Sequence, residues 1–328
     1  MDSLTQIVLG AAVGEVILGK KVGNKAMIYG AIAGTIPDLD VFIGNLYDTV
    51  TALEIHRGFS HSLTFSILAA PLFGFLISKI HKQANWKDWS KLMFWSLFTH
   101  PLLDCFTTWG TQLFWPFDLR IAIKSIFVID PLYTLPFLFC LIVASRFKRT
   151  ALKRQQWNRW GLIICSSYLL ITLLLKGAAF LKFESALADQ NITYTELETR
   201  PSPFNTILWS ANVNTEDAFL IGDYSFFDSK PIEFRVYPKK HHKINHLNQY
   251  DNLNRLKAVT KGWYLISEKQ DELYLNDLRF GLLSMNPESE NFAFSYRLEE
   301  KNNHLEITET PKDRGDAKKL LYELWKRL

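Results

Sequence analysis

The sequence predicts a mainly α-helical membrane bundle of about six helices, followed by a soluble α+β domain with an antiparallel sheet. Of the 328 residues, 48% are hydrophobic and 21% are charged, and the mean hydropathy is close to zero. Such values fit an apolar part averaged with a polar one. Apolar runs dominate from Leu4 to Leu181, whereas charged residues, Asn, Thr and alternating aromatic residues prevail from Lys182 onward. We therefore expect a membrane-embedded domain at residues 1–181 and a soluble, β-rich domain at residues 182–328.

Six apolar segments are candidates for the helices of the bundle, but several are shorter than the ~20 residues that a clean membrane span needs. Pro37, Pro101 and Pro136, together with several glycines, interrupt them. Short or broken helices are tolerated at membrane depth only where protein or water satisfies the freed backbone groups. We therefore expect a polar pocket that enters the bundle from one face. The six segments are residues 4–18, 26–43, 63–77, 92–106, 126–144 and 162–180.

The charges of the connecting loops predict the orientation of the bundle. The loops after the first, third and fifth segments carry thirteen Lys and Arg residues, whereas those after the second and fourth carry three. Cytoplasmic loops of membrane proteins are enriched in Lys and Arg. The first set of loops is therefore expected in the cytoplasm, and the domain at residues 182–328 is expected in the periplasm.

The C-terminal domain shows a different pattern. Short runs of β-branched and aromatic residues alternate with polar residues at a period of two, which predicts half-buried strands. The predicted strands are residues 218–224, 232–237, 262–267, 273–275, 292–298 and 305–308, and the predicted helices are residues 245–258 and 316–328.

Charge and cysteine content exclude other classes of protein. The formal net charge of +4 is too small to indicate nucleic-acid binding. Cys105, Cys140 and Cys165 are scattered through apolar runs without paired spacing, so neither a disulfide framework nor a zinc knuckle is indicated. We expect the three cysteines to be core residues.

Three short clusters of ionisable residues lie in or beside the apolar segments. An ionisable side chain near the bilayer centre costs about 2.5 to 3.5 kcal/mol, so several of them must be compensated by one another, by water or by a metal ion. Function is therefore the first explanation to consider. The clusters are Asp38-Leu39-Asp40, the HRGFSHS segment at residues 56–62, and His100-Pro101-Leu102-Leu103-Asp104.

Each cluster offers metal ligands, and each has a simpler alternative. His100 and Asp104 are four residues apart, so both leave the same face of a helix and can hold one divalent ion. The alternative is a hydrogen-bonded pair inside the bundle. His56 and His61 are five residues apart, an awkward interval for one helix, but Gly58 offers a bend between them.

Two aspartates and one arginine extend the predicted site. Asp38 and Asp40 follow Pro37, and in an extended or turn segment both carboxylates point to one side. The alternative is an ordinary acidic turn. Arg57 is a natural partner for a phosphate or carboxylate, because its planar donor fork matches such anions. Arg57 would otherwise pair with Asp38 or Glu54.

Weaker candidates surround these clusters. Glu15 lies near Lys20, and pairing with that lysine is the simplest explanation of its place in an apolar segment. Four polar residues are candidates for a supporting role around the site: Asp2, Ser62, Thr107 and Asp130.

These motifs together resemble the YdjM-like (DUF457) family of inner-membrane proteins described as metal-dependent hydrolases. The resemblance covers about the first 145 residues. It implies a bacterial inner-membrane location and hydrolase activity. It rests on the opening MDSLTQ, GAAVGE at residues 10–15, Pro37-Asp38-Leu39-Asp40, HRGFSHS at residues 56–62, and His100-Pro101-Leu102-Leu103-Asp104 with Thr107, Gly110 and Thr111.

We therefore expect a membrane-bound hydrolase that uses a metal-activated water on a lipid or lipid-linked (phospho)ester. Arg57 and Asp40 are the expected catalytic residues. Zinc suits mixed His and Asp ligands, with manganese and iron as alternatives. Two other functions stay open: an ion-binding or transport protein that uses the intramembrane His and Asp residues, and a structural envelope protein that works through its C-terminal domain. The expected metal ligands are Asp38, Asp40, His56, His61, His100 and Asp104.

Overall fold

The computed structural model describes residues 1–284, 290–311 and 317–328. The chain forms two compact units. The first is helical and consists of Met1–Ile43, Ile55–Leu174 and Pro203–Asn205. The second contains the strands and consists of Gly44–Glu54, Leu175–Ser202 and Thr206–Leu328. The predicted fold class, a helical region followed by an α+β domain with antiparallel strands, is confirmed.

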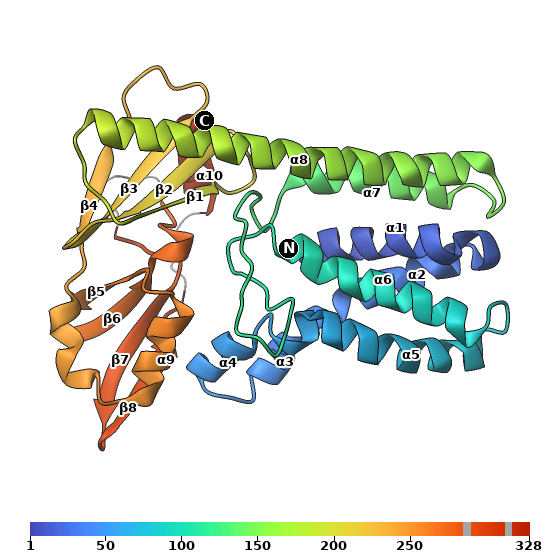
Figure 1. The fold of residues 1–328 in the computed structure, drawn as a ribbon, viewed down its shortest axis with the longest axis horizontal. Coiled ribbons are helices and arrows are strands. Elements are labelled where there is room, and N and C mark those ends of the chain that lie inside the picture. Colours follow the sequence, from blue (N-terminus) through green and yellow to red (C-terminus); the bar gives the residue numbers. More distant parts are fainter. Residues whose placement is uncertain (285–289, 312–316) are drawn as a thin grey trace. The chain divides into compact units, whose positions relative to one another are not determined.

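The helices of the first unit correspond to the six apolar segments (Figure 1). Pro37 follows the end of α2, so the segment at residues 26–43 forms a helix, a 3-10 turn and a short helix rather than one continuous span. The last helix, α8, continues into the second unit. The elements are α1 (Ser3–Val22), α2 (Asn24–Thr35), η1 (Pro37–Leu39), α3 (Asp40–Gly44), η2 (Phe59–His61), α5 (Leu63–Ile80), α6 (Trp86–Asp104), α7 (Pro131–Ser145) and α8 (Leu152–Asp189).

Within the described part of the chain, four segments are long and apolar enough to cross a membrane: Ser3–Val22, Asn24–Gly44, Leu63–Ile80 and Leu152–Asp189. The helix α7 is apolar but shorter. The helix α6 carries Lys87, Asp88 and Lys91 near its N-terminus and is not among the four.

Glycines allow α1 and α2 to pack closely. A Cβ atom added at Gly10 would lie 2.3 Å from the carbonyl oxygen of Gly30, and one added at Gly30 would lie 2.2 Å from that of Gly10. Gly14 and Gly34 extend the same contact along the two helices. Small residues that let two backbones approach are characteristic of helix packing in membranes.

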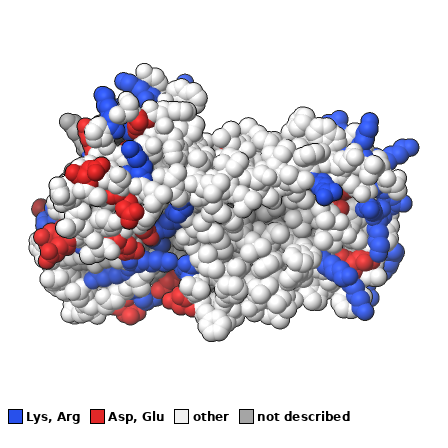
Figure 2. All heavy atoms as spheres, turned by 45° about the horizontal axis from the view of Figure 1, so that its top comes forward, with Lys and Arg blue, Asp and Glu red and all other residues white. Residues whose placement is uncertain are grey.

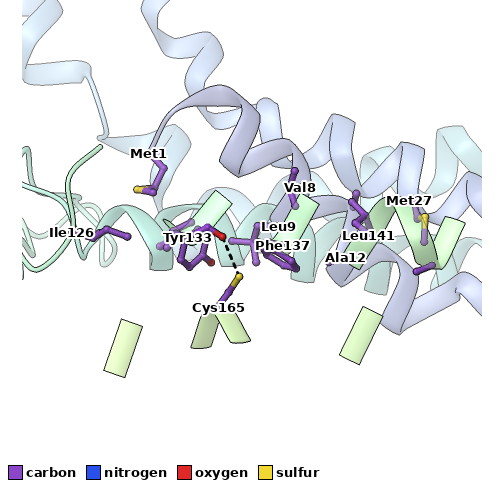
Figure 3. Packing of buried hydrophobic residues seen from close by; sticks show 13 residues of the cluster. Met1, Val8, Leu9, Ala12, Met27, Ile126, Tyr133, Phe137, Leu141 and Cys165 are labelled. Atoms are coloured by element: carbon purple, nitrogen blue, oxygen red, sulfur yellow. Dashed lines mark hydrogen bonds between the residues drawn. The ribbon is translucent and has the colours of Figure 1, made fainter. Parts of the chain in front are cut away.

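The other side of α1 packs against α7 and α8. Figure 3 shows Val8, Leu9 and Ala12 of α1 in one buried cluster with Phe137 of α7 and Cys165 of α8. The thiol of Cys165 donates to the carbonyl oxygen of Tyr133, with 3.4 Å between sulfur and oxygen (Figure 3). All three cysteines are buried and free, as the sequence predicts.

Positive charges gather at one end of the helical unit, which Figure 2 shows in blue beside largely uncharged helix surfaces. This is the end where the α1–α2, α5–α6 and α7–α8 loops lie (Figure 1). Exposed lysines of these loops include Lys20, Lys21, Lys82, Lys87 and Lys148.

In the second unit, the described residues form two four-stranded antiparallel sheets, each with its strands in chain order. Phe219 and Tyr237 of the first sheet pack against Trp263 and Leu265, so the two sheets share a core. The first sheet comprises β1 (Glu196–Pro201), β2 (Leu208–Asn214), β3 (Ala218–Ser225) and β4 (Phe234–Pro238), and the second comprises β5 (Tyr264–Lys269), β6 (Glu272–Asp277), β7 (Ser295–Lys301) and β8 (His304–Glu309).

Short helices complete this unit. The predicted helix at residues 245–258 is divided into η3 (His241–Leu247) and α9 (Asp251–Val259). The predicted helix at residues 316–328 corresponds to α10 (Ala317–Arg327), and Asp316 lies outside the described residues. The short helix η4 (Leu278–Phe280) also belongs to this unit. So does the helix α4 (Thr49–Ile55), except for its last residue, Ile55, which belongs to the first unit.

Candidate metal centre

Two histidine and two aspartate side chains meet inside the helical unit. Asp38, His61, His100 and Asp104 each offer one ligand atom, and these atoms all lie within 4.8 Å of one another. The side chains come from η1, η2 and the last turns of α6. His61, His100 and Asp104 are buried, whereas the side chain of Asp38 is 26% exposed. This group of four, which we call the metal centre, could hold a metal ion.

The imidazole rings of His61 and His100 direct their Nε2 atoms toward each other. The Nε2 atoms of His61 and His100 are 3.2 Å apart. The Oδ1 atom of Asp38 lies 3.3 Å from Nε2 of His61 and 3.4 Å from Nε2 of His100. The Oδ2 atom of Asp104 lies 3.5 Å and 3.6 Å from the same two nitrogens. Two nitrogens and two oxygens are thus directed at one point.

The hydrogen bonds behind the rings determine which nitrogen carries the proton. The Nδ1 atom of His100 lies 2.6 Å from the carbonyl oxygen of Gly34, which can only accept, so Nδ1 is the donor. The Nδ1 atom of His61 lies 3.3 Å from a carboxylate oxygen of Asp40 and 3.0 Å from the hydroxyl of Ser60. Because that hydroxyl donates to Asp40, it accepts from Nδ1 of His61. In the neutral rings both Nε2 atoms are then acceptors. Such backing of the distal nitrogen by a carbonyl or carboxylate is usual for histidines that ligate a metal.

The carboxylate of Asp104 also indicates that the metal centre binds a cation. Its Oδ2 atom is buried and accepts no hydrogen bond from any residue that the structure describes. Its charge is compensated by an ion-pair contact with Arg57, 3.2 Å from Nε to Oδ2, and by the amino group of Met1 at Oδ1. A buried acceptor without a donor is costly. Four acceptors around one point fit a divalent cation, and two imidazole nitrogens with two carboxylate oxygens form a donor set that suits zinc.

Asp40 and His56, both predicted as ligands, lie outside the metal centre. Oδ1 of Asp40 is 3.2 Å from Nδ1 of His56, and Oδ2 accepts the backbone N–H of Arg57 at 2.9 Å. The carboxylate of Asp40 therefore lies between His56 and the Nδ1 atom of His61, which is the ring nitrogen directed away from the metal centre. The physical reason is local: Pro37–Leu39 is a 3-10 turn and α3 begins at Asp40, so Asp38 and Asp40 do not share one side as they would in an extended chain.

Arg57 is buried against the metal centre. Its Nη1 atom donates to the hydroxyl of Thr107 at 2.7 Å, and that hydroxyl donates to the carbonyl oxygen of Asp104 at 2.8 Å. The pairing with Asp38 or Glu54 that the sequence allowed is not formed, because Arg57 pairs with Asp104 and Glu54 pairs with Arg255. The chain reverses at Arg57 itself, whose φ of 57° is rare for a residue with a side chain.

A comparison with known protein families shows the family of the chain. The model of the YdjM inner membrane protein family matches residues 1–179, more than half of the chain, and its match includes all four residues of the metal centre. The chain belongs to the YdjM inner membrane protein family. No curated protein and no solved structure matches it.

One residue beside the metal centre of this YdjM-family protein was not predicted. The side-chain nitrogen of Gln6 donates to Oδ1 of Asp104 at 2.9 Å and to the carbonyl oxygen of His100 at 3.3 Å. Gln6 is fully buried in α1. The sequence offered one signal for Gln6, a polar residue in an otherwise apolar helix. An amide is not a common metal ligand, however, and Asp104, the partner of Gln6, is 98 residues away in the chain.

The remaining candidates have structural roles. The side chains of Asp2, Ser62 and Asp130 accept backbone N–H groups at the starts of α1, α5 and α7, at 3.1, 3.0 and 2.9 Å. Such caps satisfy the free donors of a first helical turn. Glu15 does not pair with Lys20. Its two carboxylate oxygens instead bind the guanidinium of Arg154, each at 2.6 Å, inside the bundle.

Proposed function

We propose that this protein is a metal-dependent hydrolase of the bacterial inner membrane, with zinc at the metal centre and a lipid or lipid-linked phosphoester as substrate. One observation carries the proposal: two imidazole nitrogens and two carboxylate oxygens are directed at one point, and Oδ2 of Asp104 accepts no hydrogen bond from the described residues. A divalent ion held by Asp38, His61, His100 and Asp104 would act as a Lewis acid and activate water at neutral pH.

The residues around the metal centre have distinct tasks in this proposal. Asp40 fixes the ring of His61, and the Gly34 carbonyl fixes that of His100, so both present Nε2. Arg57 is held by Thr107 and Asp104 with its guanidinium beside the ligands. A guanidinium can donate two parallel hydrogen bonds to one anionic group, which suits a phosphate.

Apolar side chains near these residues favour a lipid substrate. Leu39 lies between Asp38 and Asp40 and is 49% exposed, and Phe42, two residues after Asp40, is 69% exposed. Phe59, between His56 and His61, is 43% exposed and packs edge to face on Trp115, with ring centroids 4.9 Å apart. Exposed apolar groups beside a charged centre fit an amphiphile better than a soluble ester.

The alternative is a non-enzymatic ion-binding or transport protein. Transport through the bundle would need ionisable groups along its whole depth. Glu15 is the acidic residue that α1 places at the other end, and both of its carboxylate oxygens are bound to Arg154. A buried carboxylate held in this way is a poor relay site, which favours the hydrolase.

The replacement Arg57→Lys tests the hydrolase directly. It keeps the charge but removes the two-pronged geometry, so turnover of lipid phosphoesters by metal-loaded protein should fall while metal occupancy stays close to that of the wild type. Arg146→Lys, in the exposed loop after α7, is the matched control and should change neither quantity. Equal turnover in the Arg57→Lys protein would remove Arg57 from catalysis. Wild-type protein without metal-dependent activity on any ester, amide or phosphoester would favour the ion-binding alternative.

A further inference from the structure

The segment at residues 44–54 connects the two parts of the polypeptide that build the metal centre. Asp38 and Asp40 come just before it, and His56, Arg57 and His61 come just after it. Those flanking residues belong to the helical unit, whereas residues 44–54 belong to the second unit. The chain therefore leaves the helical unit and returns to it between two site residues.

Arg255 binds this segment within the second unit. The Nε atom of Arg255, on α9, donates to Oε1 of Glu54 at 3.0 Å, and its Nη2 atom binds Oε2 of the same carboxylate. Nη2 also donates to the hydroxyl of Thr51 at 2.9 Å. Two-pronged binding of a carboxylate fixes direction as well as distance. The other end of α4 is capped by Asp48, which accepts the N–H of Val50 at 3.0 Å.

The path from Glu54 to the metal centre is short and covalent. Only Ile55 separates Glu54 from His56, and Arg57 follows. The backbone N–H of Arg57 donates to Asp40, whose carboxylate also backs the ring of His61. A displacement of Glu54 therefore changes the position of groups that fix the His61 ring. Coupling between two parts of a protein requires a physical connection of this kind, and it is demonstrated only by a direct measurement.

We propose that Arg255 is a positioning residue through which the C-terminal domain sets the geometry of the metal centre. The proposal rests on the metal site of the proposed function. It gives the C-terminal domain, which lies beyond the match to the family, a task in that site. Loss of the Arg255 contacts should weaken metal binding, and restoration of the ion pair with reversed charges should restore it.

Zinc affinity tests this role. We would titrate detergent-purified full-length protein with zinc against a competing chelator. Arg255→Ala should bind zinc roughly fivefold or more weakly than the wild type. The double replacement Arg255→Glu with Glu54→Arg should recover most of the loss. Arg297→Ala is the matched control, because Arg297 is 35% exposed against 34% for Arg255 and binds Glu272 and Glu299 in the same unit.

Hydrogen exchange of residues 55–61 separates this proposal from the proposed function. Faster exchange there in Arg255→Ala, but not in Arg297→Ala, is expected. Wild-type protein that binds no zinc would overturn the metal site, and the exchange result would then decide the role of Arg255 alone. Zinc affinity and exchange that are both unchanged in Arg255→Ala would overturn the proposal.

Discussion

The Nε2 atom of His61 lies 3.2 Å from the Nε2 atom of His100. The other nitrogen of the His100 ring donates to the carbonyl of Gly34. That of the His61 ring lies 3.3 Å from the carboxylate of Asp40 and 3.0 Å from the hydroxyl of Ser60, which donates to the same carboxylate. Two acceptor nitrogens at that separation repel each other unless a cation is shared between them. The carboxylate oxygens of Asp38 and Asp104 lie beside these nitrogens and add negative charge, which further favours a bound cation.

Asp40→Asn should weaken zinc binding by about 10- to 100-fold, the usual effect of removing a group that orients a ligand. The amide no longer secures the proton on Nδ1 of His61. Zinc titration of the purified protein measures the loss. Asp130→Asn, which alters the cap of α7 instead, should leave the affinity close to that of the wild type. A zinc affinity of the Asp40→Asn protein equal to that of the wild type would mean that Asp40 is not needed to orient the His61 ring.

Gln6→Leu should lower zinc affinity by about tenfold or more. The replacement removes one of the two donors to Oδ1 of Asp104, the other being the amino group of Met1, and puts an apolar side chain beside that buried oxygen. Ser96→Ala is a suitable control, since it removes a buried hydrogen bond to the Gly10 carbonyl within the same bundle. If both variants lose affinity alike, the effect of Gln6 is general loosening of the bundle and not support of Asp104.

Gly30→Ala should destabilise the helical unit by about 1 to 3 kcal/mol, as overpacking usually does. The added methyl group would lie 2.2 Å from the carbonyl oxygen of Gly10, so α1 and α2 must separate. Gly177→Ala, on α8, meets no atom within 4 Å and should raise stability by up to about 1 kcal/mol through helix propensity. Thermal unfolding in detergent compares the two. An unchanged midpoint for Gly30→Ala would show that the two helices are free to move apart.

The C-terminal domain should lie outside the cytoplasm, because the loops at the other end of the helical unit carry most of its Lys and Arg residues. A reporter that is active only in the cytoplasm, fused after Leu328, should stay silent. A bright reporter would invert the orientation and would place the metal centre on the cytoplasmic side.

Much of the fold could be predicted because long apolar helices leave a strong pattern. The strands β1 and β2 were missed. In β2, Trp209, Ala211 and Val213 alternate with polar residues, but Val213 is the single β-branched residue of the seven, so the segment lacks the composition of a strand. The strand β1, with the sequence ELETRP, is mostly polar and ends at a proline. The helix α4 is seven residues long and has no apolar face of sufficient length to be recognised.

The site was predictable in composition but not in arrangement. The i, i+4 spacing placed His100 and Asp104 on one face, which requires only that the helix forms. Asp38 and Asp40 were expected on one side because an extended turn was assumed, and the 3-10 turn separates them. The bend expected at Gly58 lies at Arg57. Gln6 and Gly34 could not be assigned, since their roles depend on the tertiary contact of α1 and α2 with α6.

The most direct test of the central claim is the metal content of detergent-purified protein after zinc loading and desalting. Wild-type protein should retain about one equivalent of zinc, the number that a single four-ligand site holds. His61→Ala and His100→Ala should retain none while they still insert in the membrane. His56→Ala should retain it, because His56 contacts Asp40 and is not part of the metal centre. Wild-type protein without bound metal, or a His100→Ala protein that binds as much as the wild type, would contradict the account.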